Sequence, residues 1–265
     1  MESSFQNRCN HPECSINTPM KHYDFKKIVL LHSKICERMY HKYNYRKFLY
    51  VDLNSGPGYY SDIKEKCSPY IYLDIIHGYC SFKPEIHFIE NNADIYTDLT
   101  DFYRNNYQGT FNDNIRFHKS GNLDFAHEFC YNYSQHNAKW MFGLVFADPM
   151  GAGKDEFNAL SIFAETFPHV DLMIHLQGAN IKRCNMSPKT NATGHLSLCE
   201  YIDLIDKKKF LIRTPHYKQQ HSFLLCTNWC DYPEYQKIGF YDIKSKKGQE
   251  IFNDIAFKKG GCIDN

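Results

Sequence analysis

The chain has 265 residues, enough for one large domain or two small ones. Its 31 Lys and Arg residues balance 30 Asp and Glu residues, and the formal charge of +1 excludes a protein that coats nucleic acid by charge alone. With 43% hydrophobic and 23% charged residues, the composition also excludes a disordered tail, a collagen-like fibre and a coiled coil. We therefore expect a folded protein with a sizeable core.

The sequence predicts a cytoplasmic protein. Its longest apolar run, Met141 to Ala147, is shorter than the roughly 18 residues that a membrane-spanning helix needs. The first residues lack the basic start and apolar stretch of a secretory signal. The 11 cysteines are scattered from Cys9 to Cys262, and we expect their thiols to be reduced.

The predicted elements alternate between helices and strands. Residues 1–23 are expected to form an irregular lead-in, and a helix is predicted over 24–43, where apolar residues recur every three or four positions. An apolar strand over 47–53 then ends in a turn-rich loop. Further helices are predicted over 68–80, 93–103, 123–133 and 156–166, and further strands over 86–90, 115–118, 142–147 and 170–176.

Strands separated by helices of about 10–15 residues are typical of a parallel sheet. We therefore predict an α/β fold, a doubly wound, Rossmann-like and mostly parallel sheet with helices on both faces, in a single domain over 24–265. The C-terminal part is expected to hold a polar insertion near 178–197, a helix over 198–210, a strand over 221–227 and a short helix or hairpin from 232. Ligands bind such sheets beyond the carboxyl ends of the strands.

The loop after the first strand, Asp52-Leu-Asn-Ser-Gly-Pro-Gly58, is the strongest candidate site. Gly56 and Gly58 allow close approach of the backbone to a ligand, and the amides that follow can hold a polar group. The loop lacks the GxGxxG spacing of dinucleotide-binding proteins, and Asp52 would repel a pyrophosphate. An acid here suits a cationic ligand such as the amino-acid end of S-adenosylmethionine, and an ordinary turn with an exposed Asp is the alternative.

Acidic and amide side chains also follow the next two predicted strands. Glu90 is placed to accept both hydroxyls of a ribose, and the alternative is an acid that caps a helix beside Asn91. Asn122 or Asp124 is the candidate to meet an adenine amino group, although Asn122 would also serve as a helix cap. Acids at two adjacent strand ends favour a nucleoside ligand.

Asp148 and Pro149 close the fourth predicted strand. A carboxylate there is expected to face a substrate over the bound cofactor, and the alternative is a cap for the helix that begins near Asp155. The neighbouring Gly151-Ala-Gly-Lys154 lacks the spacing of a phosphate-binding loop, which excludes a nucleotide kinase or ATPase. Enzymes that methylate amines of nucleic acids place Asp/Asn-Pro-Pro-aromatic here. Only the first half of that motif is present, so a base amine stays one candidate acceptor among others.

In this order the motifs resemble those of the three-Cys-motif partner proteins, which are similar to class I S-adenosylmethionine-dependent methyltransferases. The resemblance rests on Tyr50-Val-Asp-Leu-Asn-Ser-Gly-Pro-Gly-Tyr59, Phe88-Ile-Glu90, Phe146-Ala-Asp-Pro-Met-Gly151 and the stretches 26–30, 68–69, 181–183 and 223–228. It spans about residues 24–245. Met150 departs from the aromatic residue that the family usually has, and Leu53-Asn54 departs from its aromatic and small residues.

The resemblance implies S-adenosylmethionine as the cofactor. It places Asp52, Gly56 and Gly58 at the methionine end, Glu90 at the ribose and Asp148 at the face of methyl transfer. The predicted cofactor site also includes Asn54, Asn122 and Asp124, and the predicted catalytic pair is Asp148 and Pro149.

The leading hypothesis is a methyltransferase that acts on an N or O nucleophile of an unidentified nucleic acid, peptide or small molecule. Proximity and orientation would supply most of the catalysis, with Asp148 holding or deprotonating the acceptor. The alternative is a non-catalytic, nucleoside-binding partner protein that recognises another protein. The resemblance implies a radical enzyme as partner, because the family is named for its gene neighbours. Binding of NAD is a third, less favoured hypothesis.

Basic and metal-ligating residues elsewhere give weaker signals. Lys182-Arg183 and Lys207 to Lys209 are candidates for phosphate contacts, although short basic runs usually form solvated faces. Two groups of Cys and His cluster in the sequence: Cys9, His11 and Cys14, and His221, Cys226 and Cys230. Neither group contains a C-x-x-C module, so no metal site is predicted.

Overall fold

The structure, a computed structural model, describes residues 18–43, 47–110, 114–133, 138–149, 153–178, 181, 197–215, 221–229 and 233–256. The helices are α1 (Thr18–Lys42), α2 (Ser68–Tyr79), α3 (Ala93–Asn106), α4 (Asn122–Tyr133), η1 (Ala138–Trp140), α5 (Lys154–Thr166), α8 (Leu198–Asp203), α9 (Pro233–Lys237) and α10 (Lys246–Ala256). The strands are β1 (Lys47–Asp52), β2 (Tyr59–Tyr60), β3 (Glu65–Lys66), β4 (Glu85–Ile89), β5 (Ile115–His118), β6 (Met141–Ala147), β7 (Val170–Gln177), β8 (Lys209–Arg213), β9 (His221–Thr227) and β10 (Phe240–Asp242).

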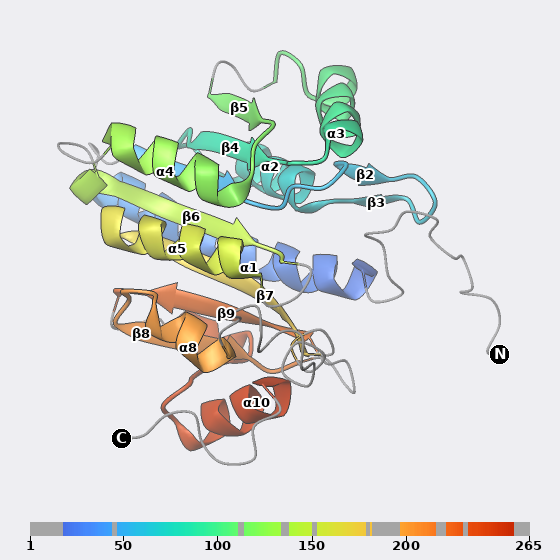
Figure 1. Ribbon diagram of the computed structural model, residues 1–265. Coiled ribbons are helices and arrows are strands. Elements are labelled where there is room, and N and C mark those ends of the chain that lie inside the picture. The colour runs from blue at the N-terminus through green and yellow to red at the C-terminus, as the bar shows by residue number, and fades with distance from the viewer. Residues whose placement is uncertain are drawn as a thin grey trace.

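A central eight-stranded sheet has the order β10-β8-β9-β7-β6-β1-β4-β5 (Figure 1). From β5 through β4, β1 and β6 to β7, neighbouring strands are parallel. β9 is antiparallel to both β7 and β8, and β10 is antiparallel to β8. The chain order reverses beside β1, which has β4 on one side and β6 on the other, and such a reversal opens a crevice at the carboxyl ends of the strands. The predicted Rossmann-like fold is confirmed.

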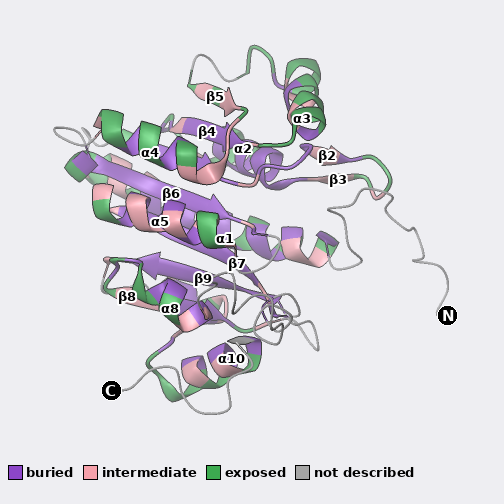
Figure 2. Cartoon of the chain, in the orientation of Figure 1, coloured by how far each residue is buried: buried purple, intermediate pink, exposed green. Residues whose placement is uncertain are grey.

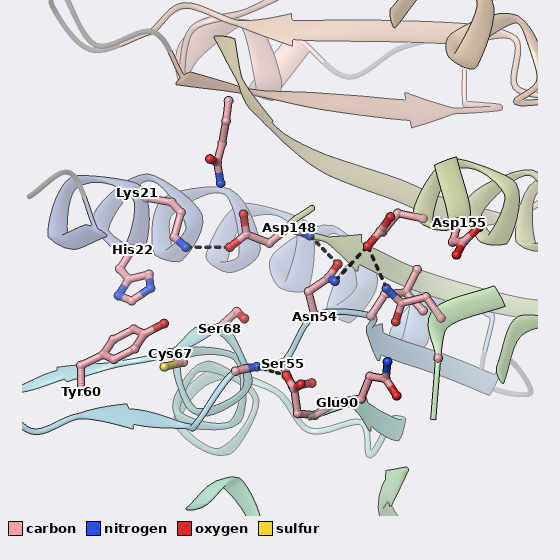
Figure 3. A pocket seen from close by; sticks show the side chains of 17 residues that line it. Lys21, His22, Asn54, Ser55, Tyr60, Cys67, Ser68, Glu90, Asp148 and Asp155 are labelled. Carbon is pink, nitrogen blue, oxygen red and sulfur yellow. Dashed lines mark hydrogen bonds and ion pairs between the residues drawn. The ribbon is translucent and has the colours of Figure 1, made fainter. Parts of the chain in front are cut away.

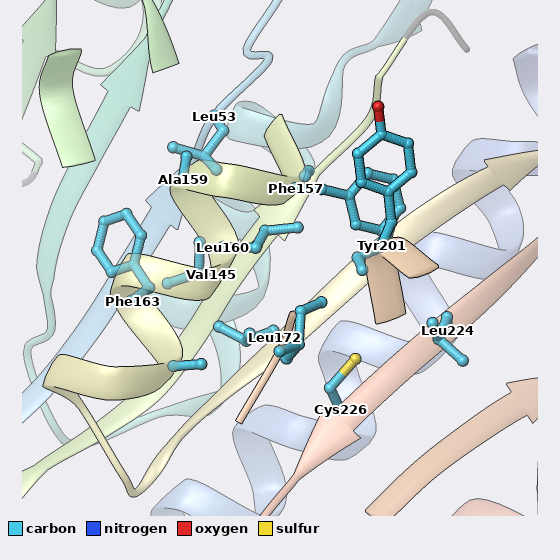
Figure 4. Close-up of a cluster of buried hydrophobic side chains, with 14 of the residues drawn as sticks. Leu53, Val145, Phe157, Ala159, Leu160, Phe163, Leu172, Tyr201, Leu224 and Cys226 are labelled. Carbon is cyan, nitrogen blue, oxygen red and sulfur yellow. The ribbon is translucent and has the colours of Figure 1, made fainter. Parts of the chain in front are cut away.

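Hydrophobic clusters cover both faces of the sheet. On one face, side chains of α4, α5, α8 and α10 pack on the strands, and Figure 4 shows Leu160 and Phe163 of α5 near Val145 and Leu172 of the sheet. The other face is covered by α1, α2 and α3. Figure 2 shows buried residues along the strands and exposed residues on the outer sides of the helices. A parallel sheet that is covered on both faces has continuously apolar strands, as observed for β6.

Two element boundaries differ from the sequence-based expectation. α1 begins at Thr18, so its first six residues fall within the predicted lead-in of residues 1–23. Its first turn tolerates Pro19, and the polar residues Lys21 and His22 mask the apolar periodicity there. The predicted helix over 198–210 ends at Asp203 in α8, and residues 209–213 form β8 instead, between β9 and β10.

Lys207 does not belong to a solvated basic face. Its side chain is buried, and Nζ donates hydrogen bonds to the carbonyl oxygens of Phe167 (2.9 Å) and Pro168 (3.3 Å). Burial lowers the pKa of this ammonium to about 8. Lys207 therefore joins the α8–β8 connection to the α5–β7 connection, and the hypothesis of a phosphate contact at this residue is wrong.

The described part of the chain contains both free and disulfide-bonded cysteines. Five cysteines there have free thiols, Cys36, Cys67, Cys80, Cys130 and Cys226. Cys199 is disulfide-bonded, which corrects the expectation of reduced thiols at this position.

Among the described helices, none is long and apolar enough to cross a membrane.

Candidate functional site

A cleft of about 240 Å³ lies beyond the carboxyl ends of β1, β4, β5 and β6, where the strand order reverses (Figure 3). The loop after β1 contributes Leu53 to Gly56, and the segments after β4, β5 and β6 contribute Glu90, Asn91, Gly121, Asn122 and Asp148. Lys21, His22, Tyr60, Cys67, Ser68, Asp155, Glu156 and Gln177 complete the lining. The fold thus brings residues from distant parts of the chain to the edge of the sheet that the strand pattern predicts.

Asp52 comes directly before the loop and is not among the residues that line the cleft. Its side chain is fully buried, and Oδ1 accepts a hydrogen bond from the backbone amide of Asn54 (3.2 Å). The Ser55 hydroxyl donates to the Asp52 carbonyl oxygen (3.1 Å). Burial raises the pKa of the carboxyl to about 7. Asp52 is therefore not the exposed acid of an ordinary turn, and its contacts hold the loop in place.

The two glycines of the loop have different roles. Gly56 and Gly58 both have a positive φ, 65° and 86°. Gly56 lines the cleft, where its backbone amide donates to Oε2 of Glu90 (3.1 Å). Gly58 lies outside the lining, and a Cβ there would overlap the ring of Tyr70. Gly56 thus keeps backbone close to the cleft, while Gly58 allows α2 to pack against the loop.

Glu90 joins the loop to the start of α3. Its Oε2 accepts from Gly56, and its Oε1 accepts from the backbone amide of Asn92 (2.8 Å). The helix cap is Asn92, whose side chain accepts from the amides of Asp94 (2.9 Å) and Ile95 (3.2 Å). Each carboxylate oxygen of Glu90 keeps a second lone pair, and the side chain lines the cleft.

Asn54 and Asn122 lie at the same side of the cleft. Both donate through Nδ2 to Oε1 of Glu156, at 3.5 and 3.4 Å. Asn54 also accepts a hydrogen bond from the backbone amide of Asp148 (3.1 Å). Asp124, in the first turn of α4, is exposed and lies outside the lining. Of the two candidates after β5, only Asn122 reaches the cleft.

Asp148 stands between the ammonium group of Lys21 and the imidazole of His175. Lys21 Nζ lies 2.6 Å from Oδ2, and His175 Nδ1 lies 2.6 Å from Oδ1. Burial alone would raise the pKa of this carboxyl, but Lys21 and His175 together hold it well below its usual range. Asp148 is not a helix cap, because the N-cap of α5 is Gly153. Pro149 is buried and lies outside the lining.

Sequence analysis missed the basic residues that α1 brings to the cleft. Burial would lower the pKa of the Lys21 ammonium, but the neighbouring Asp148 raises it. The ring of His22 stacks on that of Tyr60, with a centroid distance of 6.3 Å, and burial with nearby Lys21 lowers its pKa to about 3. A signal was present, because Lys21 shares a helical face with Phe25 and Ile28, which are both buried. A lysine on an apolar face needs an acidic partner.

Some predicted residues lie outside the described part of the chain: Cys9, His11, Cys14, Met150, Gly151, Lys182, Arg183 and Cys230. His221 and Cys226 are buried in β9. Among the described residues, no group of three or more His, Cys, Asp or Glu side chains is arranged to hold a metal ion.

Comparisons with known proteins identify the fold and no family. No protein-family model and no curated protein matches the chain. The solved structure of LPL1258 from Legionella pneumophila has a TM-score of 0.50 at 12% identity, with 81% of this chain and 89% of that one covered. At this identity the likeness shows the fold alone, a Rossmann-like α/β sheet.

Methyltransferases are among the solved structures that match at lower TM-scores. An S-adenosylmethionine-dependent methyltransferase from Agrobacterium tumefaciens has a TM-score of 0.45 at 11% identity, with 83% of this chain and 64% of that one covered. A putative methyltransferase from Thermoplasma acidophilum has a TM-score of 0.35 at 15% identity, with 71% and 70% covered.

Proposed function

We propose that the chain is an S-adenosylmethionine-dependent methyltransferase whose cofactor lies across the carboxyl ends of β1, β4 and β5. The observation that carries this proposal is the position of Glu90. Its carboxylate follows the strand beside β1, lines the cleft and contacts the glycine loop through Gly56. In nucleotide-binding sheets an acid after the second strand binds the ribose hydroxyls.

The charges of the cleft suit this cofactor. S-adenosylmethionine carries a sulfonium and an ammonium cation, and the lining contains Glu90, Asp155 and Glu156 in addition to Asp148, whose charge Lys21 balances. Among the described lining residues, Lys21 is the only lysine or arginine. The same carboxylates would repel the pyrophosphate of NAD, so the charge of the site favours a cationic ligand over a dinucleotide.

Four of the lining residues have a definite part in this arrangement. Glu90 accepts hydrogen bonds from the ribose hydroxyls, and Gly56 leaves room for the cofactor beside the backbone. The side-chain amide of Asn122 is the group suited to bond the adenine. When bound, S-adenosylmethionine supplies an electrophilic methyl group. Asp148 already accepts charged hydrogen bonds on both oxygens, so it orients its neighbours and does not take a proton from an acceptor.

Isothermal titration with S-adenosylmethionine, S-adenosylhomocysteine and NAD tests the proposal. We expect binding of the first two and not of NAD. Glu90→Gln keeps the size of the side chain and loses its charge, and it should weaken binding at least about tenfold, or 1.4 kcal/mol. The matched control is Glu128→Gln, because Glu128 is exposed on α4 and does not line the cleft. Binding of NAD alone, or of none of the three, would contradict the proposal.

A further inference from the structure

We propose that the methyl acceptor is a carboxylate, held by the ammonium group of Lys21 and methylated on oxygen to give a methyl ester. This inference rests on the proposed function and adds the substrate class to it. It comes from the part of the cleft bounded by Lys21, His22, Tyr60, Cys67 and Asp148, which we call the α1 end (Figure 3). Asp155 lies at the opposite side of the same view, and Glu90 lies between the two sides, below Asp148.

The described side chains at the α1 end are poor proton acceptors. Asp148 is bonded to Lys21 and His175 through both oxygens, and its pKa is far below the usual range. His22 has a pKa of about 3 and is a weak base. Burial raises the pKa of the Cys67 thiol, so it stays protonated. A protonated amine or an alcohol would find no proton acceptor among the described side chains of this end.

Asp52 does not supply the missing base. Its pKa of about 7 would suit proton transfer, but the carboxyl is fully buried beneath the loop and does not line the cleft. Among the described residues, the α1 end thus favours a nucleophile that does not need to lose a proton, and Lys21 favours one that is anionic. Among common oxygen nucleophiles, a carboxylic acid is ionised at neutral pH, whereas a phenol with a pKa near 10 is not.

Lys21 provides the complementary charge. Its side chain is 16% exposed, and one of the three N–H donors of its ammonium is directed to Asp148 (2.6 Å). Asp148 keeps the ammonium charged, and Lys21 is thus unable to act as a base. The remaining donors are available for an anionic oxygen, and charge-assisted hydrogen bonds of this kind are stronger than neutral ones.

The reaction needs no proton transfer. A lone pair of the carboxylate oxygen forms the bond to the methyl carbon, and the bond from that carbon to sulfur breaks with its electron pair left on sulfur. The products are a methyl ester and S-adenosylhomocysteine, so charge and atoms balance without a base. The rings of His22 and Tyr60 border the same end of the cleft.

The test measures carboxylate binding to protein saturated with S-adenosylhomocysteine. Benzoate, hexanoate and the dipeptide Gly-Phe with a free carboxyl terminus are each compared with the corresponding primary amide by titration. We expect at least one carboxylate to bind about tenfold tighter than its amide, a preference of 1.4 kcal/mol. Benzoate or hexanoate as the better ligand indicates a small acid, and Gly-Phe indicates a peptide terminus.

Variants assign the preference to Lys21. Lys21→Met should abolish it while S-adenosylhomocysteine still binds, and Lys21→Arg should retain part of it. Lys154→Met is the matched control, because Lys154 is exposed at the start of α5 and does not line the cleft. With cofactor tritiated on the methyl group, the product of the preferred carboxylate should release volatile methanol in base.

Two results would overturn the inference, and they separate it from the proposed function. Normal S-adenosylhomocysteine binding with no carboxylate bound, or with carboxylates and amides bound equally, rejects the carboxylate acceptor and leaves the methyltransferase proposal standing. Loss of S-adenosylhomocysteine binding in the unmodified protein rejects both.

Discussion

Two carboxylates at neighbouring strand ends have opposite properties in this protein. Asp52 and Asp148 end β1 and follow β6, which are adjacent in the sheet. Burial raises the pKa of Asp52, whereas Lys21 and His175 outweigh burial at Asp148 and lower its pKa. The difference lies in the partners, because a desolvated carboxyl favours its neutral form unless a cation stands beside it. Position on a strand therefore predicts where an acid lies and not which protonation state it has.

The pKa of Asp52 predicts how stability depends on pH. Below about pH 4 the carboxyl is protonated in both the folded and the unfolded chain. As the pH rises from about 4 to about 7, the unfolded chain loses this proton while the folded chain keeps it, so the free energy of unfolding falls. The upper limit of this loss is about 4 kcal/mol, from a shift of about three pKa units.

Asp52→Asn removes this titration while keeping the shape of the side chain. Relative to the unmodified protein, the variant should gain stability between pH 4.5 and 7.5, measured by urea unfolding at several pH values. Asp98→Asn serves as the control, because Asp98 is exposed on α3. Parallel pH profiles for Asp52→Asn and the unmodified protein would show that Asp52 ionises normally in the fold.

At the scale of the elements, the sequence predicts those whose pattern is local. β5 and β9 have the predicted bounds, and the helices α2 and α4 differ from theirs by one residue at one end. β8 was missed because its strand character depends on pairing with β9 and β10, which sequence periodicity does not contain. The hairpin of β2 and β3 was missed because its strands are two residues long.

The candidate site was predictable where it depends on the ends of strands. Strand ends located Asn54, Gly56, Glu90, Asn122 and Asp148, all of which line the cleft. Lys21 escaped prediction because its partner Asp148 is 127 residues away in the sequence, and only the packing of α1 on the sheet brings the two together.

The loop after β1 depends on α2 as well as on its own sequence. Gly58 has a φ of 86°, and an added Cβ would overlap the ring of Tyr70, whose hydroxyl donates to the Leu99 carbonyl (2.5 Å). Gly58→Ala should therefore destabilise the protein through backbone strain and through this overlap. Gly109 is a matched control, because it has a φ of 85° and open space around its Cβ position.

We expect Gly109→Ala to cost about 1–2 kcal/mol, the strain of a left-handed residue, and Gly58→Ala to cost more. Thermal or urea unfolding of both variants measures the difference. Titration with S-adenosylhomocysteine should show weaker binding for Gly58→Ala alone. Equal losses of stability in the two variants would mean that the ring of Tyr70 moves aside at no cost.

In the whole molecule, α1 connects the beginning of the described chain to its C-terminal part. The carboxylate of Asp24 forms a buried ion pair with the guanidinium of Arg213 in β8, and the Arg213 Nε donates to the Ile238 carbonyl (3.0 Å). Further along α1, Nε2 of His32 lies 3.4 Å from Oδ2 of Asp171 in β7. Since α1 also carries Lys21, these contacts fix the helix that reaches the cleft.

Breaking the Asp24–Arg213 pair should destabilise the whole fold in one step. Arg213→Met leaves the Asp24 carboxylate, 1% exposed, without its guanidinium, and we expect a loss of about 3–5 kcal/mol. The double variant Asp24→Leu/Arg213→Met removes both charges and should recover most of that loss. Arg38→Met, which breaks an exposed pair between α1 and α9, is the control and should have little effect.

Urea unfolding followed by far-UV circular dichroism and by tryptophan fluorescence should give coincident transitions for all variants, because α1 joins the strands that form the cleft to β8. Separate transitions in Arg213→Met would show instead that β8 and β10 unfold independently of the strands that form the cleft.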